Sequence, residues 1–239
     1  MLLRWLASAV VLLPSLANAK QVKELVARLE ARYRSARTLQ ATFLERYTEN
    51  GREVRSEAGT AYFRRPGKMR WEYERPDKDL FLVDGKTAWF YVPADHTVTR
   101  VPAKESTDLR TPLALLAGET KVSRVCARVR IEEQEKPQQS DSVLLRCELR
   151  GVKGNASGAA SATAIEGTNS ASAVFFEIVP ATGELVRLIV QQSGGVRVEF
   201  QFEDWRINPP LPDSMFRFQP PAGVAIVNGE LPQEGATVK

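Results

Sequence analysis

Few residues in this chain could carry out catalysis. The only histidine, His96, follows the turn sequence Pro93-Ala94-Asp95, so no histidine cluster is available for a metal ion or for paired acid-base chemistry. The sequence has no G-x-S-x-G elbow and no glycine-rich phosphate loop. Asp77 and Asp79 are interpreted as solvated turn residues, although a glycosidase-type carboxylate pair stays open. We therefore expect no enzyme activity, no metal site and no cofactor, and we interpret His96 as a surface turn residue.

Apolar and aromatic side chains are the informative feature instead. Met69, Trp71 and Tyr73 alternate with charged residues, which gives a strand one dry face and one wet face. A dry face of this kind could bind an apolar ligand such as an acyl chain. The residues predicted to line such a cavity are Phe43, Phe63, Met69, Trp71, Tyr73, Leu82, Trp89 and Tyr91. Periodicity by itself fits an ordinary protein core better than a ligand cavity, so both interpretations stay open here.

Arg65 adds weight to the cavity. If the alternation of Ala61 and Phe63 continues, the Arg65 guanidinium points to the same dry face, where an unpaired charge is costly. Carbonyl groups at the end of a covering helix would satisfy it, so Arg65 is predicted to latch a lid to the sheet. The alternative is an arginine at the end of a strand that reaches water.

The elements that must position these residues are mostly strands. A helix is predicted at about 21–36, because Val22, Leu25, Val26, Leu29 and Tyr33 form one apolar stripe. Strands are predicted at 39–47, 60–65, 68–73, 79–83, 87–92, 97–101, 122–133, 143–149, 173–179, 185–191 and 196–206, with 215–218 as the last paired element. Asn50-Gly51 and Asp84-Gly85 indicate type I′ turns, and Pro66-Gly67 and Pro76-Asp77 indicate two more reversals.

This pattern predicts a mainly β protein with a few helices: an unclosed antiparallel barrel of about eleven strands, lidded by helices around an apolar cavity. A short helix is predicted at 112–117, with Thr111 as its cap and Gly118 at its end. The stretch 151–172 is rich in Gly, Ala, Ser, Asn and Thr, and is predicted to be a flexible inserted loop. The main domain should extend over 20–226, followed by a C-terminal tail at 227–239.

Residues 1–19 are typical of a cleavable signal peptide. Arg4 precedes an apolar run that is too short for a bilayer span, and Ala17-Asn18-Ala19 has the small-residue pattern of a cleavage site. The mature protein is expected to be exported and soluble, and no cysteine follows the cleavage site to carry a lipid anchor. The formal net charge of +4 is spread among interspersed acidic and basic residues, so nucleic-acid binding is not expected.

The two cysteines, Cys126 and Cys147, are expected to form a disulfide in an exported protein. Placing them opposite each other centres a hairpin near Lys136-Pro137, so the bridge would join neighbouring antiparallel strands. By loop-closure entropy it would contribute roughly 3 kcal/mol. Two unpaired buried thiols are the alternative.

Three runs of this sequence resemble the periplasmic outer-membrane lipoprotein carrier (LolA-type) family. The most specific is 64–73, followed by Pro76-Asp77 and the run 83–93, VDGKTAWFYVP. The segments 112–117 and 216–224 fall where that family has similar stretches. The resemblance extends over nearly the whole mature chain.

The resemblance implies a soluble periplasmic carrier that shields the acyl chains of lipoproteins on their way from the inner to the outer membrane. Its implied partners are the acylated lipoprotein cargo, an inner-membrane ABC transporter that releases it and an outer-membrane receptor that accepts it. It also implies that Arg65 bonds the lid in the closed, empty state, that Met69 and Trp71 line the cavity and that Leu115 and Leu116 belong to the lid. We expect a monomer.

Other functions stay open on the same fold. The protein could carry a free glycolipid or another lipid, or it could sense lipids in a signalling pathway, although sensors of this type usually have a second domain. The stretch 151–172 is longer than expected of the simplest carriers, and the cysteine pair is not a family requirement, so partner specificity is open. An enzyme that depends on His96 is a further alternative.

Overall fold

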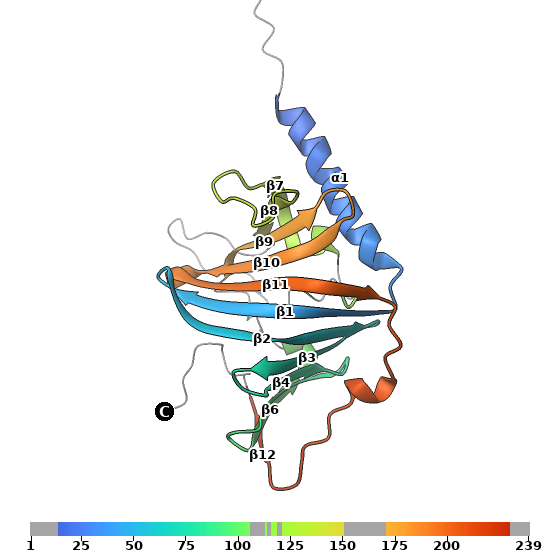
Figure 1. The fold of residues 1–239 in the computed structure, drawn as a ribbon, viewed down its shortest axis with the longest axis vertical. Helices are drawn as coiled ribbons and strands as arrows, with labels where there is room; N and C mark the ends of the chain where they lie inside the picture. Colours follow the sequence, from blue (N-terminus) through green and yellow to red (C-terminus); the bar gives the residue numbers. More distant parts are fainter. Residues whose placement is uncertain (1–13, 106–112, 114–115, 119–120, 151–170, 230–239) are drawn as a thin grey trace, which may run out of the picture.

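The computed structural model describes residues 14–105, 113, 116–118, 121–150 and 171–229. These residues form a single curved sheet of twelve strands, whose two outermost strands are not joined to each other (Figure 1). The strand order is β12-β6-β5-β4-β3-β2-β1-β11-β10-β9-β8-β7. All neighbouring strands are antiparallel except β12 and β6. The predicted open, mainly antiparallel barrel is confirmed, with twelve strands among the described residues in place of about eleven.

The elements follow in chain order. They are α1 (Pro14–Arg34), β1 (Thr38–Glu49), β2 (Arg52–Arg64), β3 (Lys68–Arg75), β4 (Leu80–Val83), β5 (Thr87–Val92), β6 (Thr97–Pro102), η1 (Ala103–Glu105), α2 (Val122–Val125), β7 (Cys126–Ile131), β8 (Val143–Leu149), β9 (Ala171–Val179), β10 (Glu184–Gln192), η3 (Ser193–Gly195), β11 (Val196–Ile207), η4 (Asp213–Phe216) and β12 (Ala225–Asn228).

Helix α1 is longer at its start than the apolar stripe predicts. It begins at Pro14, inside the segment predicted to be a signal peptide, and ends at Arg34. A proline is tolerated in the first turn because the N–H groups there have no partner within the helix. Leu25, Leu29 and Tyr33 are buried, which confirms the predicted stripe as the face that packs on the sheet. The rest of the predicted signal peptide, residues 1–13, lies outside the described part of the chain.

The two predicted type I′ turns have different outcomes. Asn50 and Gly51 have φ values of 50° and 80°, as a type I′ turn requires. At the second site only Gly85 has a positive φ, of 96°, so the prediction for Asp84-Gly85 is wrong. The Asp84 carboxylate makes this reversal instead, because its Oδ1 accepts hydrogen bonds from the backbone N–H groups of the two residues that follow Gly85 at 2.8 Å.

Three boundaries predicted from periodicity are wrong. Residues 122–125 form the helical turn α2 before β7 starts at Cys126. The segment 215–218 is not a strand, since η4 ends at Phe216. The last paired element is β12, which lies parallel to β6 and crosses the predicted boundary between domain and tail. Local backbone hydrogen bonds form α2 and η4, whereas β12 depends on pairing with a distant segment, and alternation signals neither.

Two predictions fall largely on residues that the structure leaves out. Of the predicted helix 112–117, only Leu113, Leu116 and Ala117 are described. The predicted loop 151–172 lies outside the described residues up to position 170, and β9 already begins at Ala171.

Cys126 and Cys147 form a disulfide between the neighbouring strands β7 and β8. The two residues are not directly opposite each other, because Cys126 faces Leu149 and Cys147 faces Val129. Both half-cystines are buried in the core. The bridge therefore fixes the hairpin at the edge of the sheet where α1 also packs.

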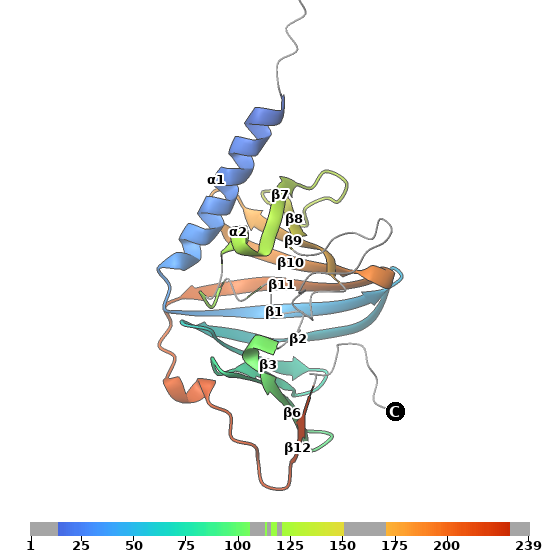
Figure 2. The same cartoon turned by 180° about the vertical axis from the view of Figure 1, so that it is seen from behind.

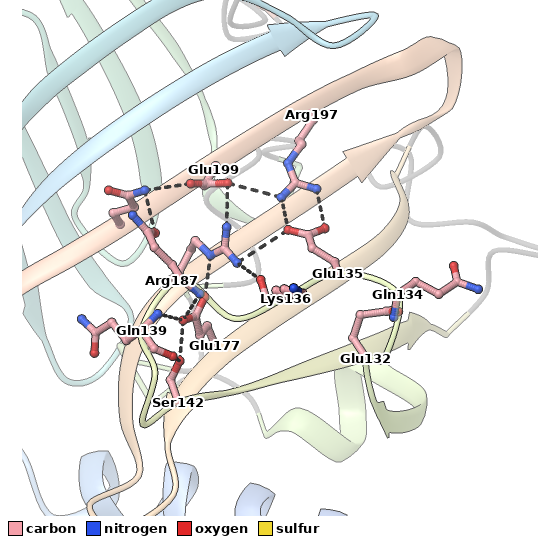
Figure 3. A network of polar contacts seen from close by, with 12 residues as sticks. Glu132, Gln134, Glu135, Lys136, Gln139, Ser142, Glu177, Arg187, Arg197 and Glu199 are labelled. Atoms are coloured by element: carbon pink, nitrogen blue, oxygen red, sulfur yellow. Dashed lines mark hydrogen bonds and ion pairs between the residues drawn. The ribbon is translucent and has the colours of Figure 1, made fainter.

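A network of ion pairs lies on the outer face of β9, β10 and β11, which is the face opposite the side chains of the main core (Figure 3). At its centre, Arg187 Nε donates to Glu177 Oε2 at 2.6 Å and Arg187 Nη1 donates to Glu199 Oε2 at 3.2 Å. Arg197 donates two hydrogen bonds to Glu135, at 3.0 and 2.5 Å. Glu177 is fully buried, so its charge depends on these donors.

The same network holds the connection between β7 and β8 against the sheet. Glu177 also accepts hydrogen bonds from the backbone N–H groups of Gln138 and Gln139 and from the Ser142 hydroxyl. A buried carboxylate with this many donors fixes the conformation of the segment that supplies them. The hairpin of β7 and β8 is therefore held at its open end by the disulfide and at its loop by hydrogen bonds to the Glu177 carboxylate.

We expect Arg187→Met to lower the free energy of unfolding by about 3–5 kcal/mol, because it leaves the Glu177 carboxylate buried without its cation. Arg130→Met is the matched control. Arg130 pairs with Glu148 at 3.8 Å on the exposed surface, so its loss should cost less than about 1 kcal/mol. Urea unfolding measures both, and equal losses would contradict a stabilising role for the network.

Acid should reduce the difference in the free energy of unfolding between wild type and Arg187→Met. Burial alone would raise the pKa of Glu199, but a hydrogen bond from Gln201 and the charges of Arg187 and Arg197 outweigh burial and lower that pKa. A carboxylate whose pKa is lowered on folding contributes stability above its ordinary pKa, and that stability is lost as the pH falls through the folded value. The difference in the free energy of unfolding between the two proteins should therefore become smaller below about pH 4.

Candidate functional site

One face of the curved sheet is largely apolar, and α1 covers one end of it; we call it the inner face. Its buried sheet residues include Leu39, Ala41, Phe43, Ala61, Phe63, Met69, Trp71, Phe81, Val83, Ala88, Leu145, Val174, Phe176, Leu188, Val190, Val198, Phe200 and Phe202. Strands β1 to β3 supply its aromatic centre, where the Trp71 ring lies 4.7 Å from Phe43 and 5.9 Å from Phe63 between centroids. Tyr73 is also buried, 5.1 Å from Phe43. The structure thus brings together Phe43, Phe63, Met69, Trp71 and Tyr73 on the inner face.

Leu82, Trp89 and Tyr91 were predicted to line the same cavity, and this prediction is wrong. In the register of β3 with β4, Trp71 faces Phe81 while Arg70 faces Leu82. Leu82 in turn faces Trp89 on β5, so all three residues lie on the outer face. Strands β4 and β5 are apolar on both faces, so alternation alone could not determine which side chains point inward.

The C-terminal segment covers these outward aromatic side chains. The ring of Phe218 lies 5.5 Å from Trp89 and 5.6 Å from Tyr91, between centroids. Arg70 donates from Nη1 to the backbone carbonyl of Met215 at 3.0 Å, which brings η4 against β3. The outer aromatic side chains are therefore part of a separate packing layer.

Sequence reasoning missed the contribution of β11, most of all Trp205. Its ring lies 5.2 Å from that of Tyr33 and 5.3 Å from that of Phe202, between centroids. Asp204, with φ of 53°, lies at an irregularity between β1 and β11 that shifts the alternation by one residue. Phe200 and Phe202 were visible as an alternating pair in the sequence, whereas the shift that turns Trp205 inward was not.

Helix α1 covers one end of the inner face. Leu25, Leu29 and Tyr33 belong to the same buried cluster as the sheet residues, and Val122 of α2 joins them. Of the residues assigned to the lid, Leu116 is fully buried in this cluster, together with Leu113 and Ala117. Leu115 lies outside the described residues. The cover of the inner face is therefore built from segments that are not strands of the sheet (Figure 2).

Arg65 reaches the C-terminal end of α1. Its Nη2 donates to the carbonyl of Tyr33 at 2.7 Å, and its Nη1 donates to the carbonyl of Arg34 at 3.2 Å. The last carbonyls of a helix have no partner within it and carry partial negative charge, so they attract a cation. Burial lowers the pKa of Arg65. The predicted contact between Arg65 and helix-end carbonyls is therefore present, and the helix is α1.

The inner face becomes polar at the end away from Arg65. Glu45 on β1 faces Glu57 on β2, and both are buried. The Tyr73 hydroxyl lies 2.7 Å from Glu45 Oε2, and Arg55 Nη2 donates to Glu57 Oε1 at 2.5 Å. Tyr73 therefore marks the border between the apolar and polar parts of the inner face.

The residues considered for catalysis differ in their exposure to solvent. His96 is exposed, at a turn with φ of 49°. Asp77 is exposed as predicted, but Asp79 is buried, and burial raises its pKa, so its interpretation as a solvated residue is wrong. Among the described residues, no group of three or more His, Cys, Asp or Glu side chains could hold a metal ion. No helix in the described part of the chain is long and apolar enough to cross a membrane.

An unclosed antiparallel sheet with one apolar face beneath a helix defines the class of open β-barrels. Comparison with known proteins places the chain within it. Residues 34–146 match the family model described as "Outer membrane lipoprotein carrier protein LolA", and residues 180–228 match one described as "Predicted periplasmic protein (DUF2092)". Relatives that are at least 30% identical over most of the chain show that it belongs to the outer-membrane lipoprotein carrier family.

Individual relatives support this membership. The outer-membrane lipoprotein carrier protein of Chromobacterium violaceum is 33% identical over 86% of this chain and 88% of its own length. That of Dechloromonas aromatica is 30% identical over 92% and 94%. A solved structure of a conserved protein from Thermus thermophilus has a TM-score of 0.52 at 14% identity, covering 87% of this chain and 98% of the other, which supports the fold.

Gly118 allows a test of how Arg65 is held. A Cβ at Gly118 would lie 3.0 Å from Cδ, Nε and Cζ of Arg65, and Gly118 has φ of 81°. Gly51 has φ of 80° with no atom within 4 Å of its Cβ position, so it is a matched control. Alanine at either position should cost about 1–2 kcal/mol of backbone energy. Gly118→Ala should cost more than Gly51→Ala, because only at position 118 would the added methyl group meet the Arg65 side chain. Urea unfolding measures both variants, and equal losses of unfolding free energy would contradict the contact.

Proposed function

We propose that this protein is a soluble periplasmic carrier that holds the acyl chains of lipoproteins against its inner face and ferries them from the inner to the outer membrane. The observation that carries the proposal is the large apolar part of the inner face, one end of which α1 covers. Membership of the carrier family supports the same conclusion, and the match of residues 180–228 to a periplasmic family model supports the compartment. The predicted signal peptide at 1–19 would direct export, leaving a mature domain at 20–226.

The energetics of acyl-chain burial are adequate for this function. Each CH₂ removed from water contributes about 0.8 kcal/mol, so covering most of an acyl chain of about 16 carbons supplies around 10 kcal/mol. Separating α1 from the inner face exposes its own apolar side chains and opposes part of that gain. The net affinity can therefore be high enough to keep the cargo in water and low enough for release.

Arg65 is proposed to set the balance between the closed, empty form and the open, loaded form. Its two hydrogen bonds go to neutral carbonyls of Tyr33 and Arg34, not to a carboxylate. Such bonds contribute modestly to stability and can be exchanged for water. An inner-membrane ABC transporter would supply the cargo to the open form, and an outer-membrane receptor would take the cargo from it.

A photo-crosslinking experiment tests the location of the cargo. Benzoylphenylalanine at position 71 should crosslink to a co-expressed acylated lipoprotein, because Trp71 is fully buried on the inner face. The same residue at position 89 should not, because Trp89 lies on the outer face of the neighbouring part of the sheet. Native mass spectrometry identifies the adducts.

The adducts also separate the alternatives. Crosslinks from position 71 that disappear when the acylated cysteine of the cargo is removed support a lipoprotein carrier. Adducts with small lipids alone would show a carrier or sensor of another lipid or glycolipid. No adduct from position 71 under any condition would overturn the proposal and make the inner face an ordinary core.

Arg65→Leu tests the latch. Without its bonds to α1, the closed form is weakened, so a fluorescent fatty acid should enter the inner face faster and be handed over to acceptor vesicles more slowly. Arg64→Leu is the matched control, since Arg64 lies on the outer face and pairs with Asp213 at 3.1 Å. Stopped-flow fluorescence measures both steps, and the latch is contradicted if the two variants behave alike.

A further inference from the structure

Helix α1 is bound very unequally to the two parts of the sheet. On the side of β7 to β11, Arg28 donates to the carbonyl of Pro180 at 2.8 Å, Arg32 forms an ion pair with Glu184, and Glu30 accepts the backbone N–H of Val122 at 3.0 Å. These contacts lie within about one and a half turns at the C-terminal part of the helix. On the side of β1 to β6, within the described residues, the side-chain hydrogen bonds to α1 come from Arg65 alone.

Tyr33 provides the innermost contact with the β10 side. Its hydroxyl accepts the backbone N–H of Leu185 at 3.0 Å, and its ring contacts that of Trp205. Trp205 Nε1 in turn donates to the Leu185 carbonyl at 2.8 Å. Both backbone groups of Leu185 are therefore satisfied by side chains.

Strand pairing in the sheet does not satisfy the backbone N–H and carbonyl of Leu185, so side chains do so. The pairing of β10 with β9 shifts between Leu185 and Arg187, and the pairing of β10 with β11 starts only at Arg187. Leu185 therefore has no register partner on β11, and a buried amide without a partner would be costly. Tyr33 is itself almost completely buried, and burial raises its pKa well above the usual range, so the hydroxyl stays protonated.

We propose that Tyr33 is a positioning residue that keeps α1 docked on β10 and β11 independently of Arg65. When the inner face opens, α1 then moves together with β9 to β11 and separates from β2. This inference rests on the proposed function, because the opening is what admits the cargo. It adds that the contact of Arg65 with α1 breaks on opening, whereas the contact of Tyr33 with β10 persists.

The proposal also assigns the route of entry. If α1 stays with β10, the gap opens where Arg65 releases the helix, beside Phe63 and Met69 at the ends of β2 and β3. An acyl chain would enter between α1 and these strands, and would reach Trp71 without crossing the network on the outer face.

A covalent staple gives the decisive test. Arg32→Cys with Glu184→Cys, joined by a short bis-maleimide, fixes α1 to β10 in the otherwise intact protein, whose own cysteines are bonded to each other. Uptake of a fluorescent fatty acid should stay within about twofold of the unstapled double variant. Uptake that falls tenfold or more on stapling would overturn the proposal, since α1 would then have to leave β10.

Hydrogen exchange tests the anchor without any ligand. In Arg65→Leu, the amides of 21–34 should stay protected, whereas Arg65→Leu with Tyr33→Phe should exchange at least about tenfold faster there. Tyr62→Phe in the Arg65→Leu background is the control, because Tyr62 is a half-buried tyrosine that faces Arg70 on the outer face. Loss of protection in Arg65→Leu alone, or no effect of Tyr33→Phe, would contradict the anchor.

The two experiments separate failure of the anchor from failure of the proposed function. If no fatty acid binds to any variant, the carrier function is contradicted while the exchange data still decide whether Tyr33 holds α1. If fatty acid binds but the staple blocks its uptake, the function stands and the anchor is wrong.

Discussion

The structure depends on one constraint, which is that the apolar face of an unclosed sheet must be kept from water. A closed barrel would bury its interior by hydrogen bonding its first strand to its last, but here β12 and β7 are not joined. The inner face is covered instead by α1 and by the segment around Leu113 and Leu116. Such a cover can be exchanged for an apolar ligand, because both offer the same kind of surface.

Two arginines are held in the structure by very different partners. Arg187 is 8% exposed and is surrounded by carboxylates, so removing it leaves buried charge behind. Arg65 binds two backbone carbonyls, and its Nε has no hydrogen-bond partner among the described residues. The first arrangement fixes a hairpin to the outer face, whereas the second leaves a cation that water can satisfy equally well.

Much of this could be predicted from the sequence, for identifiable reasons. Where one face of a strand is charged, as in β3, alternation correctly placed Met69, Trp71 and Tyr73 on the inner face. Where both faces are apolar, as in β4 and β5, alternation could not show which residues point inward, and Trp89 and Tyr91 were assigned to the wrong side. Trp205 was missed because a local shift in β11 reverses the alternation.

Long-range pairing was the other limit on prediction. The carbonyl partners of Arg65 were expected from the cost of burying its charge, but which helix supplies them depends on how the chain folds in three dimensions. The parallel strand β12 likewise has no local signal, since its side chains are exposed and its partner β6 is more than a hundred residues away in sequence.

An unclosed sheet leaves two edges that could recruit strands from other molecules. On one side, β12 is only four residues long and fully exposed, and it shields the longer β6 behind it. On the other, β7 carries exposed Arg128 and Arg130, and like charges on a short edge oppose the addition of a second copy. The chain can therefore keep its barrel open for a ligand without offering an extended template for fibril growth.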